Sequence, residues 1–231
     1  MTATLVAALT AVGLAVGWLM DPVITRVPRR LPVTGPVDDP TLQPSPVARQ
    51  AIVAVVCGAL FGGVAARFAG SWALPAYLVL AASLVALSAI DLEHYILPNR
   101  IVYPLVPTMI GLLAIASLGD DDFEAFGRAL LAGFVAFATF FVLHLISPRS
   151  MGFGDVKLAF VLGVSLGWLS WSEVLLGLFL GFVYGAAVGV VLLALRIRDR
   201  HQALPFGPFL AAGALTAILF GDAMITWYRG S

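Results

Sequence analysis

Eight apolar stretches, most of them close to 20 residues long, recur along this chain of 231 residues. An α-helix needs about 20 apolar residues to cross the roughly 30 Å hydrocarbon layer of a bilayer. Only 11% of the residues are charged, against about 25% in a typical soluble domain. The sequence therefore predicts an all-α polytopic membrane protein with about eight transmembrane helices and lipid as its main surroundings. The expected spans, of which the sixth is short, lie near residues 2–20, 47–68, 72–90, 101–118, 126–146, 158–171, 174–195 and 205–225.

The same composition excludes several other classes of protein. Cys57 is the only cysteine, which excludes a disulfide scaffold. Thirteen basic residues balance thirteen acidic ones without forming a basic stripe, so nucleic acid is not an expected partner. We expect residues 1–231 to form a single membrane-embedded domain. Its one extended polar stretch is the Pro-rich segment 21–46, where a long helix is not expected.

Lysine and arginine are unevenly divided between the connections. If the N-terminus lies outside the cell, ten of these residues fall in cytoplasmic connections, and only Arg67, Arg128 and Arg229 fall outside. Cytoplasmic loops of membrane proteins carry an excess of positive charge. The distribution therefore predicts an N-terminus outside, in a multi-pass protein of the inner or plasma membrane.

Two acidic residues stand beside apolar stretches, where a charge is costly. Asp91 closes the third stretch and Asp155 precedes the sixth, so the predicted topology puts both at the cytoplasmic face. Two carboxyls about 3 Å apart share one proton, so one can take a proton from water while the other donates one. This is the arrangement that an aspartic protease requires. Taken singly, a solvated helix end explains Asp91, and a turn with an N-cap explains Asp155.

The residues around Asp155 have expected uses of their own. Gly152 and Gly154 lack Cβ, so backbone or substrate can approach them closely. The Asp155 carboxylate can cap the helix that follows. Lys157 either acts on a neighbouring acid, holds the substrate C-terminal to the cut, or anchors the cytoplasmic face.

The remaining acids have plainer explanations. Among them, Glu173 and Asp222 are expected simply to lie at the outer ends of spans.

Four segments, in the order of a known family, resemble the prepilin peptidases among the GxGD intramembrane aspartic proteases. Residues 152–158 resemble the GxGD signature, and residues 91–99 resemble the motif of the first aspartate. Residues 204–213 are similar to a Pro-Phe-Gly-Pro stretch, and residues 17–28 to an N-terminal block that ends in Arg-Xaa-Pro.

The resemblance implies a type IV leader peptidase, which cuts the short basic leader from prepilin-like proteins. The cut precedes the hydrophobic N-terminal helix of the substrate and lies at the cytoplasmic membrane face. Asp91 and Asp155 would be the catalytic pair. The supporting or substrate-binding residues would be Gly152, Phe153, Gly154 and Lys157.

The sequence departs from this family in one respect. Many members also N-methylate the new N-terminus with S-adenosylmethionine, and they carry a cytoplasmic insertion with paired Cys-Xaa-Xaa-Cys motifs that resemble a zinc site. Here the segment 21–46 contains no cysteine, and four thiolates cannot be assembled from Cys57 alone. We therefore expect no zinc and no other metal, and the departure argues against methyltransferase activity. Asp21 stands where the family commonly has Asn.

Two alternatives stay open from the residues alone. An ion-coupled membrane transporter without peptidase activity also keeps rare acids and broken, Gly-rich helices, although more often near the bilayer midplane. An inactive assembly scaffold would hold the two carboxyls too far apart for one water to bridge.

Overall fold

The computed structural model describes residues 2–34, 46–148, 151–195 and 205–230, and these residues form helices without any strand. The all-α fold class is thereby confirmed. The helices are α1 (Thr2–Leu19), α2 (Asp21–Arg26), α3 (Val47–Phe68), α4 (Leu74–His94), α5 (Asn99–Gly119), α6 (Phe123–Ile146), α7 (Phe153–Leu169), α8 (Trp171–Ala194) and α9 (Gly207–Arg229).

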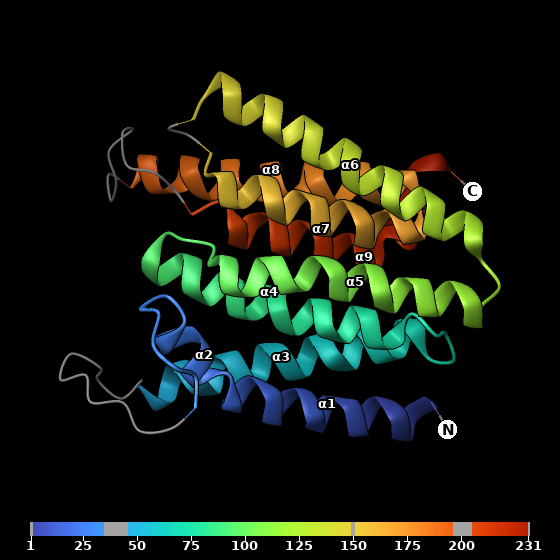
Figure 1. Cartoon of the computed structure of the whole chain (residues 1–231), viewed down its shortest axis with the longest axis horizontal. Helices are drawn as coiled ribbons and strands as arrows, with labels where there is room; N and C mark the ends of the chain where they lie inside the picture. Colours follow the sequence, from blue (N-terminus) through green and yellow to red (C-terminus); the bar gives the residue numbers. More distant parts are fainter. Residues whose placement is uncertain (1, 35–45, 149–150, 196–204, 231) are drawn as a thin grey trace.

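The long helices run up and down along one axis of the molecule (Figure 1). At one end of the bundle, α4 ends and α7 begins, and we call this the site end. The short helix α2 and the beginning of α9 also lie there. At the opposite end, α1 begins and α9 ends, and the α5–α6 and α7–α8 connections turn (Figure 1).

Seven helical segments are long and apolar enough to cross a membrane. They correspond to seven of the eight predicted spans, and the segment Val47–Phe68 has the predicted bounds. The predicted sixth span is the exception. It corresponds to α7, whose 17 residues reach about 26 Å at 1.5 Å per residue, less than the hydrocarbon thickness.

The helix α7 is instead the most enclosed helix of the bundle. It packs against α5, α6, α8 and α9. Most of its side chains are buried, including Leu158, Leu162 and Leu166, which have no exposed surface. Because neighbouring helices cover most of its surface, most positions of α7 are apolar.

Glycine lets neighbouring helices come close together. A Cβ added to Gly163 of α7 would lie only 2.6 Å from the carbonyl oxygen of Ala132 in α6. Between α8 and α9, Gly213 approaches Gly177 and Gly181 so closely that a Cβ on it would lie 2.4 Å from backbone atoms of both. Such close backbone approach is a main source of helix association in a bilayer.

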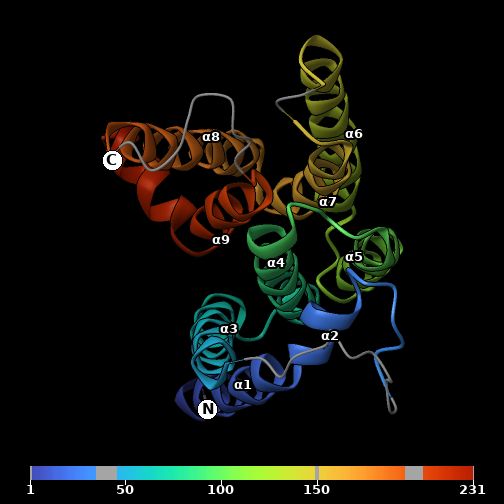
Figure 2. The same ribbon diagram turned by 90° about the vertical axis from the view of Figure 1, so that its left-hand side faces the viewer.

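The helix α4 lies between the α1–α3 pair and the α7–α9 helices, as the view onto the site end shows (Figure 2). It packs against α2, α3, α5 and α9. Its C-terminal turn therefore brings Asp91 to the middle of the site end.

The polar segment 21–46 begins with the six-residue α2, followed by turns. Its described part thus contains no long helix, as predicted, and residues 35–45 lie outside the described residues. Of the ten basic residues that predict the cytoplasmic face, four also lie outside the described residues, namely Arg149, Arg196, Arg198 and Arg200.

Candidate active site

Asp91 is buried at the end of α4, with only 5% of the residue exposed. Its Oδ2 accepts a hydrogen bond of 3.1 Å from the backbone N–H of Gly207, the first residue of α9. The helix stops at His94, and Tyr95 closes it in a left-handed conformation with φ 56°. Asp91 is thus a buried, oriented carboxyl rather than a solvated helix end.

Asp155 is the third residue of α7 and is 7% exposed. Its Oδ2 accepts a hydrogen bond of 3.1 Å from the backbone N–H of Gly152, the N-cap residue of α7. A carboxylate that reaches back from the third helical position in this way is one half of a capping box. The predicted capping role is confirmed, and it fixes the direction of the carboxyl.

The two aspartates come together at the site end from different helices. The negative charge of Asp91 acts electrostatically on the Asp155 carboxyl. Leu97, in the α4–α5 connection, packs against a glycine beside each of the two aspartates. Its Cβ lies 2.9 Å from a Cβ built on Gly154, and its Cδ2 lies 3.2 Å from one built on Gly207. The site is therefore bounded by the end of α4, the beginnings of α7 and α9, and Leu97.

The electrostatics of this pair suit proton transfer. Within the described part of the chain, no ion pair involves Asp91 or Asp155. Each carboxyl is held by one backbone N–H, which orients it without fixing its charge. Two buried carboxyls about 3 Å apart that lack a cation share a proton, and a pair of this kind can act as base and acid toward a water.

The other predicted site residues divide into two groups. Gly152 and Gly154 adjoin the pair, since one donates a hydrogen bond to Asp155 and the other packs against Leu97. Phe153 and Lys157 turn away from it. The Lys157 ammonium binds Oδ1 of Asn99 at 2.9 Å and lies 4.9 Å from the centre of the Phe153 ring. It forms no ion pair with either aspartate in the described residues.

An ion-pair network beside Asp91 was missed by the sequence analysis. Arg49 of α3 donates from Nη1 to both carboxylate oxygens of Glu93 at 2.8 Å, and from Nη2 to Asp21. Glu93 lies two residues after Asp91, so the network joins α2, α3 and the end of α4. Asp21 stood out only as a departure from the family pattern, and nothing local in the sequence indicated its partner.

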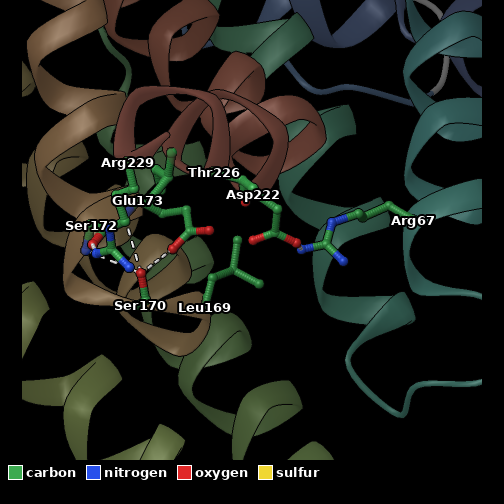
Figure 3. A pocket seen from close by; sticks show the side chains of 9 residues that line it. Arg67, Leu169, Ser170, Ser172, Glu173, Asp222, Thr226 and Arg229 are labelled. Carbon is green, nitrogen blue, oxygen red and sulfur yellow. Dashed lines mark hydrogen bonds and ion pairs between the residues drawn. The ribbon is translucent and has the colours of Figure 1, made fainter. Parts of the chain in front are cut away.

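A second polar cluster lies at the opposite end, around a cavity of about 300 Å³ (Figure 3). Glu173 of α8 is 3% exposed and accepts a hydrogen bond from Ser170, while Asp222 of α9 pairs with Arg67 of α3. Glu173 is therefore buried and bonded, and is more than the plain span end that we expected. Because Arg67 compensates this cluster and joins α3 to α9, we interpret it as structural.

The fold and the aspartate pair together define an integral membrane protein with a candidate site of the aspartic type. The profile of the type IV leader peptidase family matches residues 78–193, a segment that contains both aspartates. The chain belongs to this family.

The similarity to curated relatives supports membership of the same family. The chain is 34% identical over 186 residues to the prepilin leader peptidase/N-methyltransferase of Stutzerimonas stutzeri, covering 78% of this chain and 61% of the relative. It is 35% identical over 187 residues to the protein of that name from Pseudomonas aeruginosa, with the same two shares. The chain thus spans about 61% of the length of these relatives. No solved structure matches, and the comparisons give the transporter alternative no support.

Proposed function

We propose that this protein is a membrane aspartic endopeptidase that removes the leader peptide from prepilin-like proteins. The observation that carries the proposal is the pair of buried carboxyls, Asp91 and Asp155, at one end of the bundle and without an ion-pair partner in the described residues. Membership of the type IV leader peptidase family and the similarity to prepilin leader peptidases support it.

The proposed reaction needs no group beyond these two carboxyls and a water. The ionised carboxyl takes a proton from the water, which attacks the carbonyl carbon of the scissile peptide bond. The protonated carboxyl donates its proton to the carbonyl oxygen. The first carboxyl then passes the proton that it took from water to the leaving nitrogen as the C–N bond breaks, and the new carboxyl group returns a proton to the other aspartate. The N–H groups of Gly152 and Gly207 hold the two carboxyls in place during these transfers.

The proposed substrate is a prepilin or pseudopilin with a basic leader and a hydrophobic helix. We place the protein in the inner membrane with the site end toward the cytoplasm. The uneven distribution of lysine and arginine supports this orientation, because ten of the thirteen fall in the cytoplasmic connections of the topology predicted from the sequence. A leader held at the cytoplasmic face would then meet the aspartates directly.

Acid-to-amide substitutions test the assignment. In proteoliposomes, Asp91→Asn and Asp155→Asn should each slow leader removal from a prepilin by at least about 100-fold, because each removes one partner of the proton transfer. The matched control is Asp222→Asn at the opposite end, which should retain cleavage. A normal rate of cleavage by either site variant, measured by gel shift, would rule out the proposed pair.

We further propose that the protein cuts without zinc and without N-methylation. The support is the segment 21–46, which contains no cysteine. In the same assay, addition of S-adenosylmethionine should leave the mass of the new N-terminus unchanged, and a chelator should leave the cleavage rate unchanged. A methylated product, detected by mass spectrometry, would contradict this part of the proposal alone.

A further inference from the structure

Two adjoining hollows lie at the end of the bundle opposite the aspartates. The first is the cavity of about 300 Å³ described above, which we call the polar cavity (Figure 3). The second is a hollow of about 660 Å³ between α8 and α9, which we call the apolar groove. Ser172 of α8 and Ile225 and Arg229 of α9 line both of them. The two hollows therefore share a boundary that is built from both helices.

The polar cavity is lined by two cations and two acids, namely Arg67, Arg229, Glu173 and Asp222. Figure 3 shows the two carboxyls between the two guanidinium groups. Arg67 and Asp222 pair with each other, and this pair has the structural role described above. Arg229 and Glu173 form no ion pair within the described residues. The cavity thus presents one further charge of each sign.

These two remaining charges lie in different surroundings. Nη2 of Arg229 donates a hydrogen bond of 3.2 Å to Oγ of Ser172, so the cation stands at the boundary of the two hollows. Glu173 lies deeper, with 3% of the residue exposed, and accepts a hydrogen bond from the Ser170 hydroxyl. An ionised carboxylate has about four acceptor positions, so this one hydroxyl does not saturate it. A ligand that places N–H donors beside Glu173 is therefore favoured.

The apolar groove continues from the boundary into the membrane-spanning part of the two helices. Its side chains include Leu175 and Phe179 of α8, and Trp227 and Tyr228 of α9. Ser172 and Phe179 are seven residues apart, which is about 10 Å along a helix axis. Trp227 and Tyr228 are 84% and 85% exposed, and such rings are enriched where a bilayer meets water. The groove therefore begins at a membrane interface and extends into the apolar layer.

We propose that the two hollows together bind a zwitterionic phospholipid whose headgroup carries a primary amine. The phosphate lies at the boundary, where it accepts hydrogen bonds from Arg229 and Ser172. The ammonium enters the polar cavity and donates to Glu173, and one acyl chain lies in the apolar groove. Charge-assisted hydrogen bonds of both kinds are strong in a site that excludes water. The inference does not depend on the proposed peptidase function.

The chemistry of the two hollows distinguishes this ligand from its competitors. A choline headgroup has no N–H to donate to the buried Glu173 carboxylate. An anionic headgroup would bring a net negative charge to a cavity whose cations and acids balance. An apolar helix of a second copy of this chain would cover the apolar groove, but it would leave the charges of the polar cavity without partners.

Lipid binding to the purified whole chain tests the proposal. Native mass spectrometry from detergent micelles compares phosphatidylethanolamine, phosphatidylcholine and phosphatidylglycerol with identical acyl chains. The ethanolamine lipid should bind at least about tenfold more tightly than either of the others, because only its headgroup satisfies both remaining charges. Equal affinities for the ethanolamine and choline lipids overturn the proposal without any protein variant.

Two variants assign the headgroup contacts. Glu173→Gln should abolish the preference for ethanolamine over choline, and Arg229→Gln should weaken all three lipids at least about tenfold. The matched control is Glu124→Gln, an exposed acid in the first turn of α6, which lies at the same end but outside the polar cavity. A preference that survives Glu173→Gln overturns the proposed contact. If Glu173→Gln unfolds, the comparison of lipids on the wild-type protein decides alone.

A third variant tests the apolar groove. Leu175→Trp fills it and should weaken the ethanolamine lipid at least about tenfold. Phe220→Trp is the control, because Phe220 of α9 is exposed and lines neither hollow. Unchanged binding to Leu175→Trp overturns the placement of the acyl chain. A dimer without bound lipid, lost in Leu175→Trp, would show instead that a second copy covers the groove, and this too overturns the proposal.

Discussion

At the scale of single residues, each site aspartate depends on one backbone N–H from a glycine. Gly207 donates to Asp91, and Gly152 donates to Asp155. A Cβ on Gly207 would lie 2.8 Å from Oδ2 of Asp91, closer than real Cβ contacts allow. The absence of a side chain at this position therefore determines where the Asp91 carboxyl sits.

We expect Gly207→Ala to displace the Asp91 carboxyl and to lower kcat for leader removal by about 10- to 100-fold, since small misplacements of catalytic groups cost that much. The measurement is prepilin cleavage in proteoliposomes. Gly111→Ala is the control, because nothing lies within 4 Å of a Cβ built there. If both variants cut at the wild-type rate, the close fit between Gly207 and Asp91 has no catalytic importance.

Several site residues could be predicted from the sequence. Asp91 and Asp155 stood out as acids beside apolar stretches, and the cap made by Asp155 was expected from its place before a helix. Gly207 lies in the Pro-Phe-Gly-Pro stretch, but its bond to Asp91 was not predicted, because it lies 116 residues from Asp91 and no local pattern connects the two. The same holds for Arg49 and Glu93, which are joined by an ion pair across 44 positions.

At the scale of elements, α6 and α7 show how small residues set helix packing. A Cβ on Gly163 would meet the Ala132 carbonyl oxygen at 2.6 Å and the Ala136 Cβ at 2.7 Å. The facing surface of α6 is built from small residues, so neither neighbour has a flexible end that can yield. Insertion of a methyl group there has to push the two helices apart.

We expect Gly163→Ala to destabilise the protein by about 1–3 kcal/mol, the usual cost of overpacking a close-packed interior. The control is Gly127→Ala in α6, where a Cβ would meet nothing within 4 Å and the alanine favours the helix by about 1 kcal/mol. Thermal unfolding in detergent measures both. Equal melting temperatures for the two variants would contradict the close α6–α7 packing.

At the scale of the whole molecule, the arrangement of the helices places both aspartates at one end and the Glu173–Asp222–Arg67 cluster at the other. The proposed orientation turns the first end toward the cytoplasm. The α4–α5 connection belongs to the site end and the α5–α6 connection to the opposite end (Figure 1).

Cysteine labelling tests this orientation. Ile96 is 44% exposed in the α4–α5 connection, and Phe123 is 58% exposed where α6 begins. A membrane-impermeant maleimide should label Phe123→Cys in intact spheroplasts, and Ile96→Cys only after the membrane is opened. Cys57 is fully buried and contributes no background. The reverse labelling pattern would place the candidate site outside the cell and refute the proposed localisation.

The sequence by itself determined that the chain enters a membrane as helices, because span formation is local. About 20 apolar residues that satisfy their own backbone hydrogen bonds are enough, wherever the neighbouring helices lie. The seven longer expected spans were therefore found, and the remaining one, α7, is the short helix that the sequence indicated.

The tertiary structure alone decided which distant partners the acids have. Asp91 meets Gly207, Glu93 meets Arg49, and Glu173 is enclosed rather than solvated. These contacts depend on how closely helices from distant parts of the chain pack, and that distance is set by side-chain volumes on two facing surfaces at once. No single stretch of sequence contains that information.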